Sequence, residues 1–556
     1  MRSYLSAILI TYVAFVAAAP LQGQPSPPDL ILFNGKIFTS NLQQLHVEAV
    51  AIRGDRIVAV GDSPRIKSLA GPKTKSIDLG GRTVVPGIND AHLHLGIEPA
   101  NIVELKLSGM NPSWDEVKSA ITAAAAKAPE GAFISGEVGP AIFSNLDVNR
   151  ESLDKISLGH PVLLATLTGH AQFLNSAALA KLNLHDGQPD PMGGRYEKDT
   201  NGKLTGVLRE YAVINAGRVW EAMTTDAVGV SQLRDQLQQA VMLGITSIQN
   251  MSSVPPARFI SLVEKAPTTI RVRVMRVALT TPSGRDPQED VSLPRNPSPL
   301  ITVTGTKWIL DGTPLENTFL PRNSGSSGEH LSMEDGILQL DPLFPPLEIP
   351  AILRETLASK DQLLVHVAGT PSAAAMLDAM EASGGENVWS AKRVRFEHGD
   401  GVLADMLPRM KKLGVMDVEN PTHLGMITVI PELFHGKPLE KTQPLKSFLD
   451  SGVPLALGSD GPMNPYLNIM LASMHPDRPS EAITREQAVI AYTLTSAYAE
   501  FEEKEKGSLE PGKLADLAVL SQDIFAIIPD ELPKTVSVLT LVGGKIVYDG
   551  KAVAVN

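Results

Sequence analysis

The chain has 556 residues, a formal net charge of −12 and 43% hydrophobic residues, enough material for one large globular domain and a smaller one. The acidic balance argues against nucleic acid as a partner, because phosphate binding needs a basic face and the sequence has no Lys/Arg cluster. Cysteine is absent, which excludes thiolate metal sites, thiol nucleophiles, disulfides and lipoprotein acylation.

Residues 1–24 are predicted to be a signal peptide. Arg2 precedes an apolar run over residues 5–19, which is too short for a comfortable bilayer span, and a Pro-rich stretch over residues 20–28 follows. We therefore expect an exported protein, periplasmic or secreted, with no membrane span in the mature chain. An uncleaved anchor is the alternative, and a proline directly after three alanines leaves the cleavage point open.

Both ends of the remaining chain have the pattern of short β-strands. Asn34-Gly35 and Gly54-Asp55 are tight-turn dipeptides between apolar segments, which predicts antiparallel hairpins, and Gly543-Gly544 predicts another near the C-terminus. Isolated hairpins are marginally stable in water, so residues 29–83 and 505–556 are predicted to pair into one small β domain.

Between these ends, residues 84–504 alternate apolar strands with long helical stretches, which is typical of βα units around a parallel sheet. Helices are predicted over residues 114–128, 231–243, 372–382 and 484–499. Strands are predicted over residues 84–89, 162–167, 245–249, 270–279, 301–310, 363–368, 393–397, 415–419 and 454–458.

A closed barrel needs eight strands, and this pattern contains one more. The segment over residues 162–167 is predicted to be the extra strand, within a long insertion around residues 96–230. The Ser/Gly-rich residues 323–328 are predicted to form a flexible loop near the active face.

The strand that begins at Val84 leads through Pro86-Gly87 to His92 and His94. Side chains two apart on a strand point to the same face, so the two imidazoles project together. Such a pair suits a metal ion, although a bare His-x-His pair also occurs by chance.

Other predicted strands also end in potential metal ligands. In barrels of this type the chemistry lies at the carboxyl ends of the strands, where this chain offers His366, His398 and Asp460. A single His at an apolar strand end is more often a hydrogen-bonded core residue than a ligand. Four histidines and an aspartate at four strand ends favour a metal site, because several mutually close buried imidazoles would each need a partner.

Lys307 lies in the apolar strand that continues through Trp308. A buried lysine cation beside metal ions would be costly. Reaction of its amine with carbon dioxide would give an anionic carbamate able to bridge two ions. The alternative is a lysine that extends along the surface into solvent.

Together these motifs make the chain resemble the amidohydrolase superfamily, and more narrowly amidohydrolase family 3, the YtcJ-like branch that includes N-substituted formamide deformylase. The resemblance extends over nearly all of the mature chain and rests on residues 86–94, 169–179, 202–210, 244–247, 307–312, 366, 397–398, 459–460 and 509–516.

The resemblance implies an α/β fold, a (β/α)8 TIM-like barrel with a composite β-sandwich built from both termini. It also implies two divalent ions, usually zinc. The expected ligands are His92, His94 and Asp460 for one ion, His366 and His398 for the other, and carboxylated Lys307 as the bridge.

The sequence departs from the family's pattern at two points. Relatives commonly continue the fifth-strand His motif into Gly-Asp, whereas Gly369 is here followed by Thr370. Relatives often place Gln-Pro before a later His, whereas Asn420-Pro421 precedes His423 here. Neither departure removes a ligand, so we expect a changed pocket rather than loss of metal.

In the implied mechanism, the metal lowers the pKa of its bound water from about 15.7 to about 7 and polarises the substrate carbonyl. Asp460 is expected to accept the proton and deliver it to the leaving nitrogen. The candidates for binding a small-molecule substrate are His170, Glu210, Trp308 and His423. For His170 and Glu210, hydrogen-bonded scaffolding is an equal alternative, and a homodimer is left open.

The leading hypothesis is an exported hydrolase that cleaves an amide, N-acyl, N-formyl or carbamoyl C–N bond. A deaminase or esterase would use the same activated water. A non-catalytic binding protein on this scaffold is a further alternative. The last is metal-free serine hydrolysis by Ser152 and Lys155, which match Ser-x-x-Lys without its partner motifs.

Overall fold

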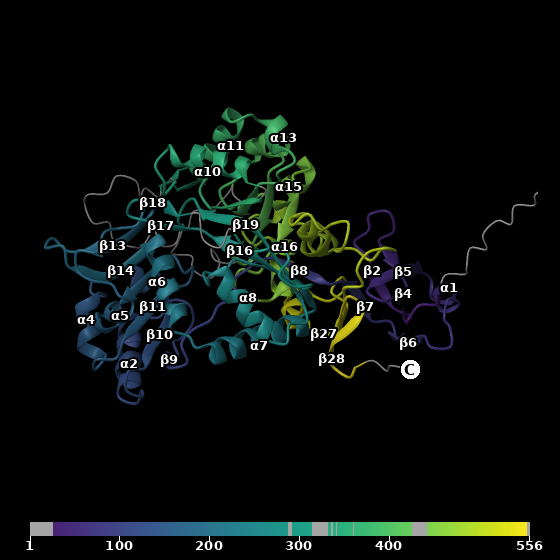
Figure 1. The fold of residues 1–556 in the computed structure, drawn as a ribbon, viewed down its shortest axis with the longest axis horizontal. Coiled ribbons are helices and arrows are strands. Elements are labelled where there is room, and N and C mark those ends of the chain that lie inside the picture. Colours follow the sequence, from purple (N-terminus) through teal and green to yellow (C-terminus); the bar gives the residue numbers. More distant parts are fainter. Residues whose placement is uncertain are drawn as a thin grey trace, which may run out of the picture.

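The structure, a computed structural model, describes residues 26–286, 292–313, 332–334, 337–340, 342–359, 361–424, 441 and 443–552. Three bodies follow one another along the longest axis (Figure 1). The insertion lies at one end, the barrel in the middle, and a β-sandwich at the other end. The segment predicted as a signal peptide and the predicted loop over residues 323–328 lie outside the described residues.

The central sheet has eight parallel strands in the order of a barrel. A parallel bridge between Leu93 and Asp460 joins its first and last strands. The eight are those predicted from the sequence without the segment at residues 162–167, so the predicted barrel is confirmed. In chain order they are β8 (Ile88–Leu93), β15 (Ile245–Asn250), β16 (Arg271–Val277), β19 (Ile301–Ile309), β22 (Leu363–Val367), β23 (Arg395–His398), β24 (Met416–Glu419) and β25 (Leu455–Leu457).

Helices pack around the barrel strands, and their apolar side chains join those of the strands in the largest core cluster. The predicted helix over residues 484–499 is interrupted by a π-helical turn, Ala491–Thr495. The main helices are α7 (Asp226–Met242), α8 (Pro256–Lys265), α10 (Glu348–Ala358), α11 (Thr370–Ala382), α12 (Glu386–Trp389), α13 (Leu407–Leu413), α15 (Leu445–Ser451), α16 (Pro465–Met474), α17 (Arg485–Ile490) and α18 (Ser496–Tyr498).

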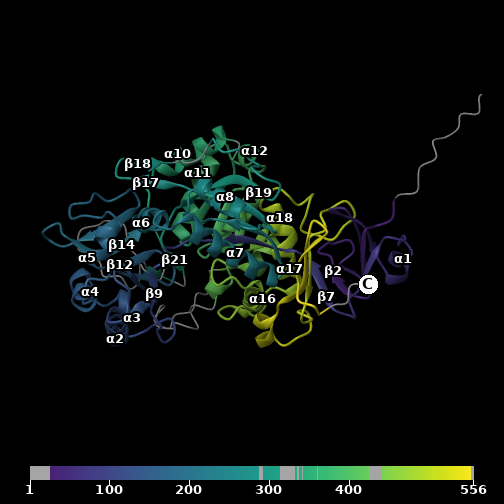
Figure 2. The ribbon, with the colours of Figure 1, turned by 60° about the horizontal axis from the view of Figure 1, so that its bottom comes forward.

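Strands from both termini form the β-sandwich, with the purple N-terminal and yellow C-terminal strands side by side in Figures 1 and 2. One sheet has the order β5-β4-β1-β6, and the other β28-β27-β26-β7-β2-β3. Their bounds are β1 (Leu30–Phe33), β2 (Lys36–Phe38), β3 (His46–Val47), β4 (Ala49–Arg53), β5 (Arg56–Gly61), β6 (Lys75–Asp78), β7 (Thr83–Pro86), β26 (Leu517–Leu520), β27 (Ser537–Val542) and β28 (Lys545–Asp549).

Two of the three predicted hairpins are present. Gly54-Asp55 joins the antiparallel pair β4 and β5, and Gly543-Gly544 joins β27 and β28. The prediction of a hairpin at Asn34-Gly35 is wrong, because β1 and β2 belong to different sheets. The turn there carries the chain from one layer of the sandwich to the other.

The predicted strand over residues 84–89 is in fact two strands separated by Gly87. β7 pairs with β26 in the sandwich, whereas β8 pairs with β15 in the barrel. A Cβ at Gly87 would lie 2.1 Å from the Oγ1 of Thr246, so only glycine fits at this crossing between the two domains.

The insertion has its own sheet, order β13-β14-β12-β11-β10-β9, and its own core clusters. Its strands are β9 (Ile102–Glu104), β10 (Phe133–Val138), β11 (Val162–Thr166), β12 (Ala171–Leu174), β13 (Gly194–Lys198) and β14 (Leu204–Glu210). Its helices are α2 (Trp114–Ala125), α3 (Pro140–Phe143), α4 (Arg150–Ile156), α5 (Ser176–Lys181) and α6 (Tyr211–Ala222). Within the described part of the chain, no helix is both long and apolar enough to cross a bilayer.

Candidate metal centre

A cavity of about 850 Å³ lies between the carboxyl ends of the barrel strands and the insertion. The barrel contributes the histidine cluster, Lys307 and Asp460. The insertion contributes strands β10, β11 and β12 and helix α6. The two bodies therefore enclose one pocket, with the charged chemistry on the barrel side.

His92, His94 and Asp460 converge at the junction of the first and last strands. The Nε2 atoms of His92 and His94 lie 3.2 Å apart, and the Oδ1 of Asp460 lies 3.3 Å from His94 Nε2 and 3.8 Å from His92 Nε2. Ligand atoms about 2.0–2.1 Å from a tetrahedral zinc ion lie about 3.3 Å from one another. These three side chains therefore fit an ion of that size.

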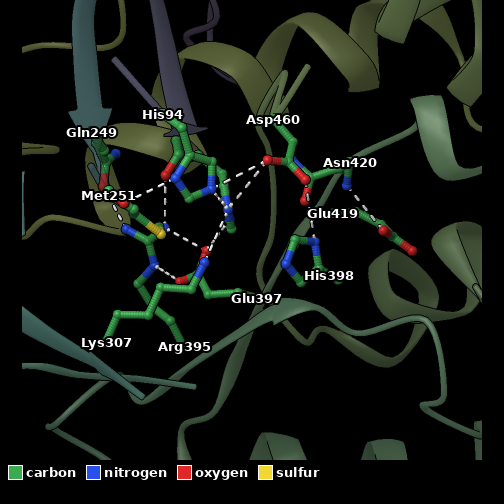
Figure 3. A network of polar contacts seen from close by, with 12 residues as sticks. His94, Gln249, Met251, Lys307, Arg395, Glu397, His398, Glu419, Asn420 and Asp460 are labelled. Carbon is green, nitrogen blue, oxygen red and sulfur yellow. Dashed lines mark hydrogen bonds and ion pairs between the residues drawn. The ribbon is translucent and has the colours of Figure 1, made fainter. Parts of the chain in front are cut away.

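On the other side of Asp460 lie His398 and His423 (Figure 3 shows His398). The Oδ2 of Asp460 lies 3.5 Å from His423 Nε2 and 3.9 Å from His398 Nδ1. The buried His398 Nδ1 has no hydrogen-bond partner among the described residues. Three ligand atoms within 4.8 Å of one another thus form a second group that fits an ion, and Asp460 belongs to both groups.

His366 also joins the cluster, although it lies outside these two groups. Its ring centroid is 4.4 Å from that of His398, and its Nε2 lies 3.6 Å from the Oδ1 of the buried Asp311. Asp311 in turn accepts hydrogen bonds from the backbone N–H groups of Ala368 and Gly369, which fixes its orientation.

Lys307 is 4% exposed, and its Nζ lies 3.2 Å from His92 Nε2. Burial lowers the pKa of its ammonium group, against the opposing charges of Glu397 and Asp460. Within the described part of the chain it forms no ion pair. A lowered pKa favours the neutral amine, which is the form of lysine that reacts with carbon dioxide.

The local backbone explains how these side chains reach one another. Gly458 precedes the Asp460 strand end, and a Cβ there would lie 2.4 Å from the Cβ of His92. The backbone N–H of Asp460 donates to the carbonyl of His92 at 2.8 Å. Asp460 and His398 both have φ in the left-handed region, at 54° and 76°. Such strained backbone concentrates at functional sites.

The site is electrostatically polarised. Although burial alone would raise the pKa of Asp460, its contact with His423 and the nearby His92 and His94 hold it well below its usual range. Burial, with the charge of Lys307, lowers the pKa of His92 to about 4. The site therefore presents a neutral imidazole and an ionised carboxylate, the forms that bind metal.

His170 and Glu210 come from the insertion and face the barrel histidines. The Nδ1 of His170 lies 2.6 Å from Glu210 Oε2, and the ring centroids of His170 and His366 lie 4.9 Å apart. Glu210 has φ 51°, a strained value for a non-glycine residue. Both line the pocket, and their role in substrate binding stays a prediction.

Trp308 does not line the pocket. Side chains alternate along β19, so Lys307 and Ile309 face the cavity and Trp308 faces the opposite side. Trp308 is 2% exposed and packs edge-on against Phe344 with Arg285 over its ring. The prediction that Trp308 contacts substrate is therefore wrong, and its side chain packs in the hydrophobic core instead.

Sequence reasoning missed the carboxylates that hold the histidines. Glu397 contacts His92, Asp400 contacts His423, and Asp311 contacts His366. The only signal in the sequence was position, since Glu397 and Asp400 flank His398 within two residues. Their contacts are with histidines elsewhere in the chain, so the pairing needed the fold.

Ser152, the candidate nucleophile, serves a local structural role. Its hydroxyl accepts from the backbone N–H of Asn149 and so closes a capping box at the start of α4. It does not line the large cavity.

Three curated relatives match nearly the whole chain. Protein LONG AFTER FAR-RED 3 of Arabidopsis thaliana is 28% identical, with 94% of this chain and 91% of the relative covered. N-substituted formamide deformylase of Arthrobacter pascens is 26% identical, with 94% and 98% covered. Putative amidohydrolase YtcJ of Bacillus subtilis (strain 168) is 26% identical, with 93% and 99% covered.

A solved structure shares the fold at low identity. An uncharacterized metal-dependent hydrolase from Pyrococcus horikoshii OT3 has a TM-score of 0.66 and 21% identity, with 90% of this chain and 99% of that chain covered. The amidohydrolase family model matches residues 75–548, from the N-terminal sandwich strands through the barrel to the last strand. With histidines, a lysine and an aspartate gathered at the strand ends of such a barrel, this chain belongs to the amidohydrolase family.

Proposed function

We propose that the chain is an exported hydrolase that cleaves a C–N bond of an amide, N-acyl, N-formyl or carbamoyl compound. The observation that carries the proposal is the convergence of His92, His94 and Asp460 at ligand spacing in a cavity of about 850 Å³. The similarity to N-substituted formamide deformylase supports the choice of an amide-type bond.

Two divalent ions, zinc by preference, are proposed for this site. His92, His94 and Asp460 would hold one, His366 and His398 the other, and carboxylated Lys307 would bridge them. His423 lies beside His398 and Asp460 in the second ligand-spaced group and is proposed to contact the substrate. A divalent ion held there supplies an activated water and polarises the scissile carbonyl.

The chain's own residues would complete the reaction. One carboxylate oxygen of Asp460 accepts the proton of the attacking water and returns it to the leaving nitrogen. His170, fixed by Glu210, binds the polar part of the substrate. Val213, Ile214 and Trp220 on α6 form an apolar wall opposite the cluster, which suits an alkyl or aromatic substituent.

Metal removal tests the proposal directly. Protein stripped by a chelator should lose hydrolysis of N-acyl and N-formyl amides and regain it with zinc, and His92→Ala should lower kcat/KM by about a thousandfold or more. Ser152→Ala should retain full activity. Activity that survives the chelator but disappears in Ser152→Ala would replace this proposal with serine hydrolysis.

Carboxylation of Lys307 has its own test. Lys307→Ala should lose bound metal and activity, because the bridging anion is gone, and short carboxylates such as acetate or propionate should restore part of both. Metal content measured with and without the added carboxylate gives the answer. Undiminished metal binding in Lys307→Ala would show that the lysine is not a ligand.

Export is tested by expression of the full chain in a bacterial host and N-terminal sequencing of the product in each fraction. The mature protein should appear outside the cytoplasm, with its N-terminus near the end of the predicted signal peptide over residues 1–24. Full-length protein retained in the membrane fraction would instead assign an uncleaved anchor.

A further inference from the structure

We infer that Glu397, held by Arg395, is a positioning residue that sets the metal affinity of His92. This inference rests on the proposed metal-dependent function. It concerns a carboxylate that lies behind the proposed ligands rather than among them.

The contact between Glu397 and His92 is short and completely buried. The Oε2 of Glu397 lies 2.7 Å from His92 Nδ1, and neither side chain is exposed. A carboxylate can only accept here, so the imidazole Nδ1–H donates and the proton-free Nε2 is directed toward His94, Lys307 and Asp460. Glu397 thus selects the tautomer that can bind a metal.

Arg395 fixes the carboxylate from the other side. Its Nε and Nη2 donate to the two oxygens of Glu397 at 2.7 and 3.1 Å, and its Nη2 also donates to the carbonyl of Ala91 at 2.7 Å. Gln249 accepts from Arg395 Nη1. Figure 3 shows Arg395 between Gln249 and Glu397. The hydrogen-bonded series Gln249–Arg395–Glu397–His92 therefore holds the imidazole of His92 in one orientation.

The two neighbouring histidines are held by acceptors of different charge. His94 Nδ1 lies 2.9 Å from the carbonyl of Met251, a neutral acceptor, whereas His92 faces a full carboxylate. A carboxylate partner makes an imidazole a more basic ligand, and loss of such a partner commonly costs about 10–100-fold in metal affinity. A buried ion pair is by itself weak evidence of a stabilising role.

The test compares Glu397→Gln with a matched control, Glu500→Gln. Glu500 is a buried carboxylate that follows α18; it pairs with Lys506 at 2.8 Å and accepts from Asn89, and within the described residues it forms no ion pair with a histidine. Zinc affinity is measured by competition with a chromogenic chelator, and the fold of each apo-protein by circular dichroism. Glu397→Gln should bind zinc about 10–100-fold more weakly, and Glu500→Gln should bind it as the wild type does.

Arg395→Met provides a second variant. It leaves the Glu397–His92 contact without its support and should weaken zinc binding in the same direction, by a smaller factor. Equal zinc affinity in wild type and folded Glu397→Gln overturns the inference. Absence of zinc binding in the wild type overturns the proposed function instead, so the two failures are distinguishable.

Discussion

At the scale of single residues, Asp460 is where the two halves of the site meet. Each of its oxygens faces a different pair of histidines, and its backbone N–H bonds to His92. One side chain is therefore proposed both to hold metal and to move a proton, and the two roles can be separated by a substitution that keeps its shape.

Asp460→Asn keeps a ligand oxygen but cannot take up a proton at neutral pH. We expect kcat to fall by about 10²–10⁴-fold, the usual contribution of a general acid–base group, with at least one zinc ion retained. Steady-state kinetics beside metal analysis checks this. Loss of all metal would make Asp460 chiefly a ligand, and unchanged kcat would remove it from catalysis.

Residue types at strand ends were enough to predict most of the cluster. His92, His94, His366 and Asp460 each follow an apolar run, and barrel topology alone brings such ends together. Trp308 was misassigned although it directly follows Lys307 on one strand, because side-chain alternation turns it to the face opposite the proposed ligand. Glu397 was overlooked because its role is defined by a contact with a histidine 305 positions away.

At the scale of elements, the crossing from sandwich to barrel at Gly87 leaves no room for a side chain. The sequence predicted one continuous strand there, because Val84 to Asn89 is apolar throughout apart from its last residue. The pairing of β7 with β26 and of β8 with β15 shows that the two strands belong to different sheets.

Gly87→Ala should destabilise the protein by at least about 1–3 kcal/mol, the usual cost of overpacking, because its Cβ would overlap the Thr246 side chain. Denaturant unfolding gives the difference. Gly96→Ala is the matched control, since a Cβ there meets nothing within 4 Å. Equal stability of the two variants would show that the junction has room to relax.

At the scale of the whole molecule, a partly buried ion pair joins barrel and sandwich. Arg271, at the start of β16, donates to Asp516, beside β26, at 2.8 and 3.1 Å, and Asp516 also accepts from the backbone N–H of Gly543.

The overall architecture was predictable because strand and helix periodicities are local. The pairing of its distant ends was predicted only from the weakness of isolated hairpins.

Asp516→Ala should lower the free energy of unfolding by about 1.5–3 kcal/mol, because hydrogen bonds to a charged group are lost in a buried setting. Asp549→Ala, which breaks a more exposed pair with Lys551, should cost no more than about 1 kcal/mol. Thermal and denaturant unfolding compare the two. A separate early transition in Asp516→Ala would show that the sandwich unfolds independently of the barrel.

The pairing of β7 with β26 has a consequence for how the protein is made. Strand β7 leaves the ribosome long before its partner β26 has been translated, and it leads directly to the segment that carries His92. A premature stop or proteolytic trimming near the C-terminus would leave β7 without that neighbour. Damage near β26 thus reaches, far back in the sequence, the segment that carries His92.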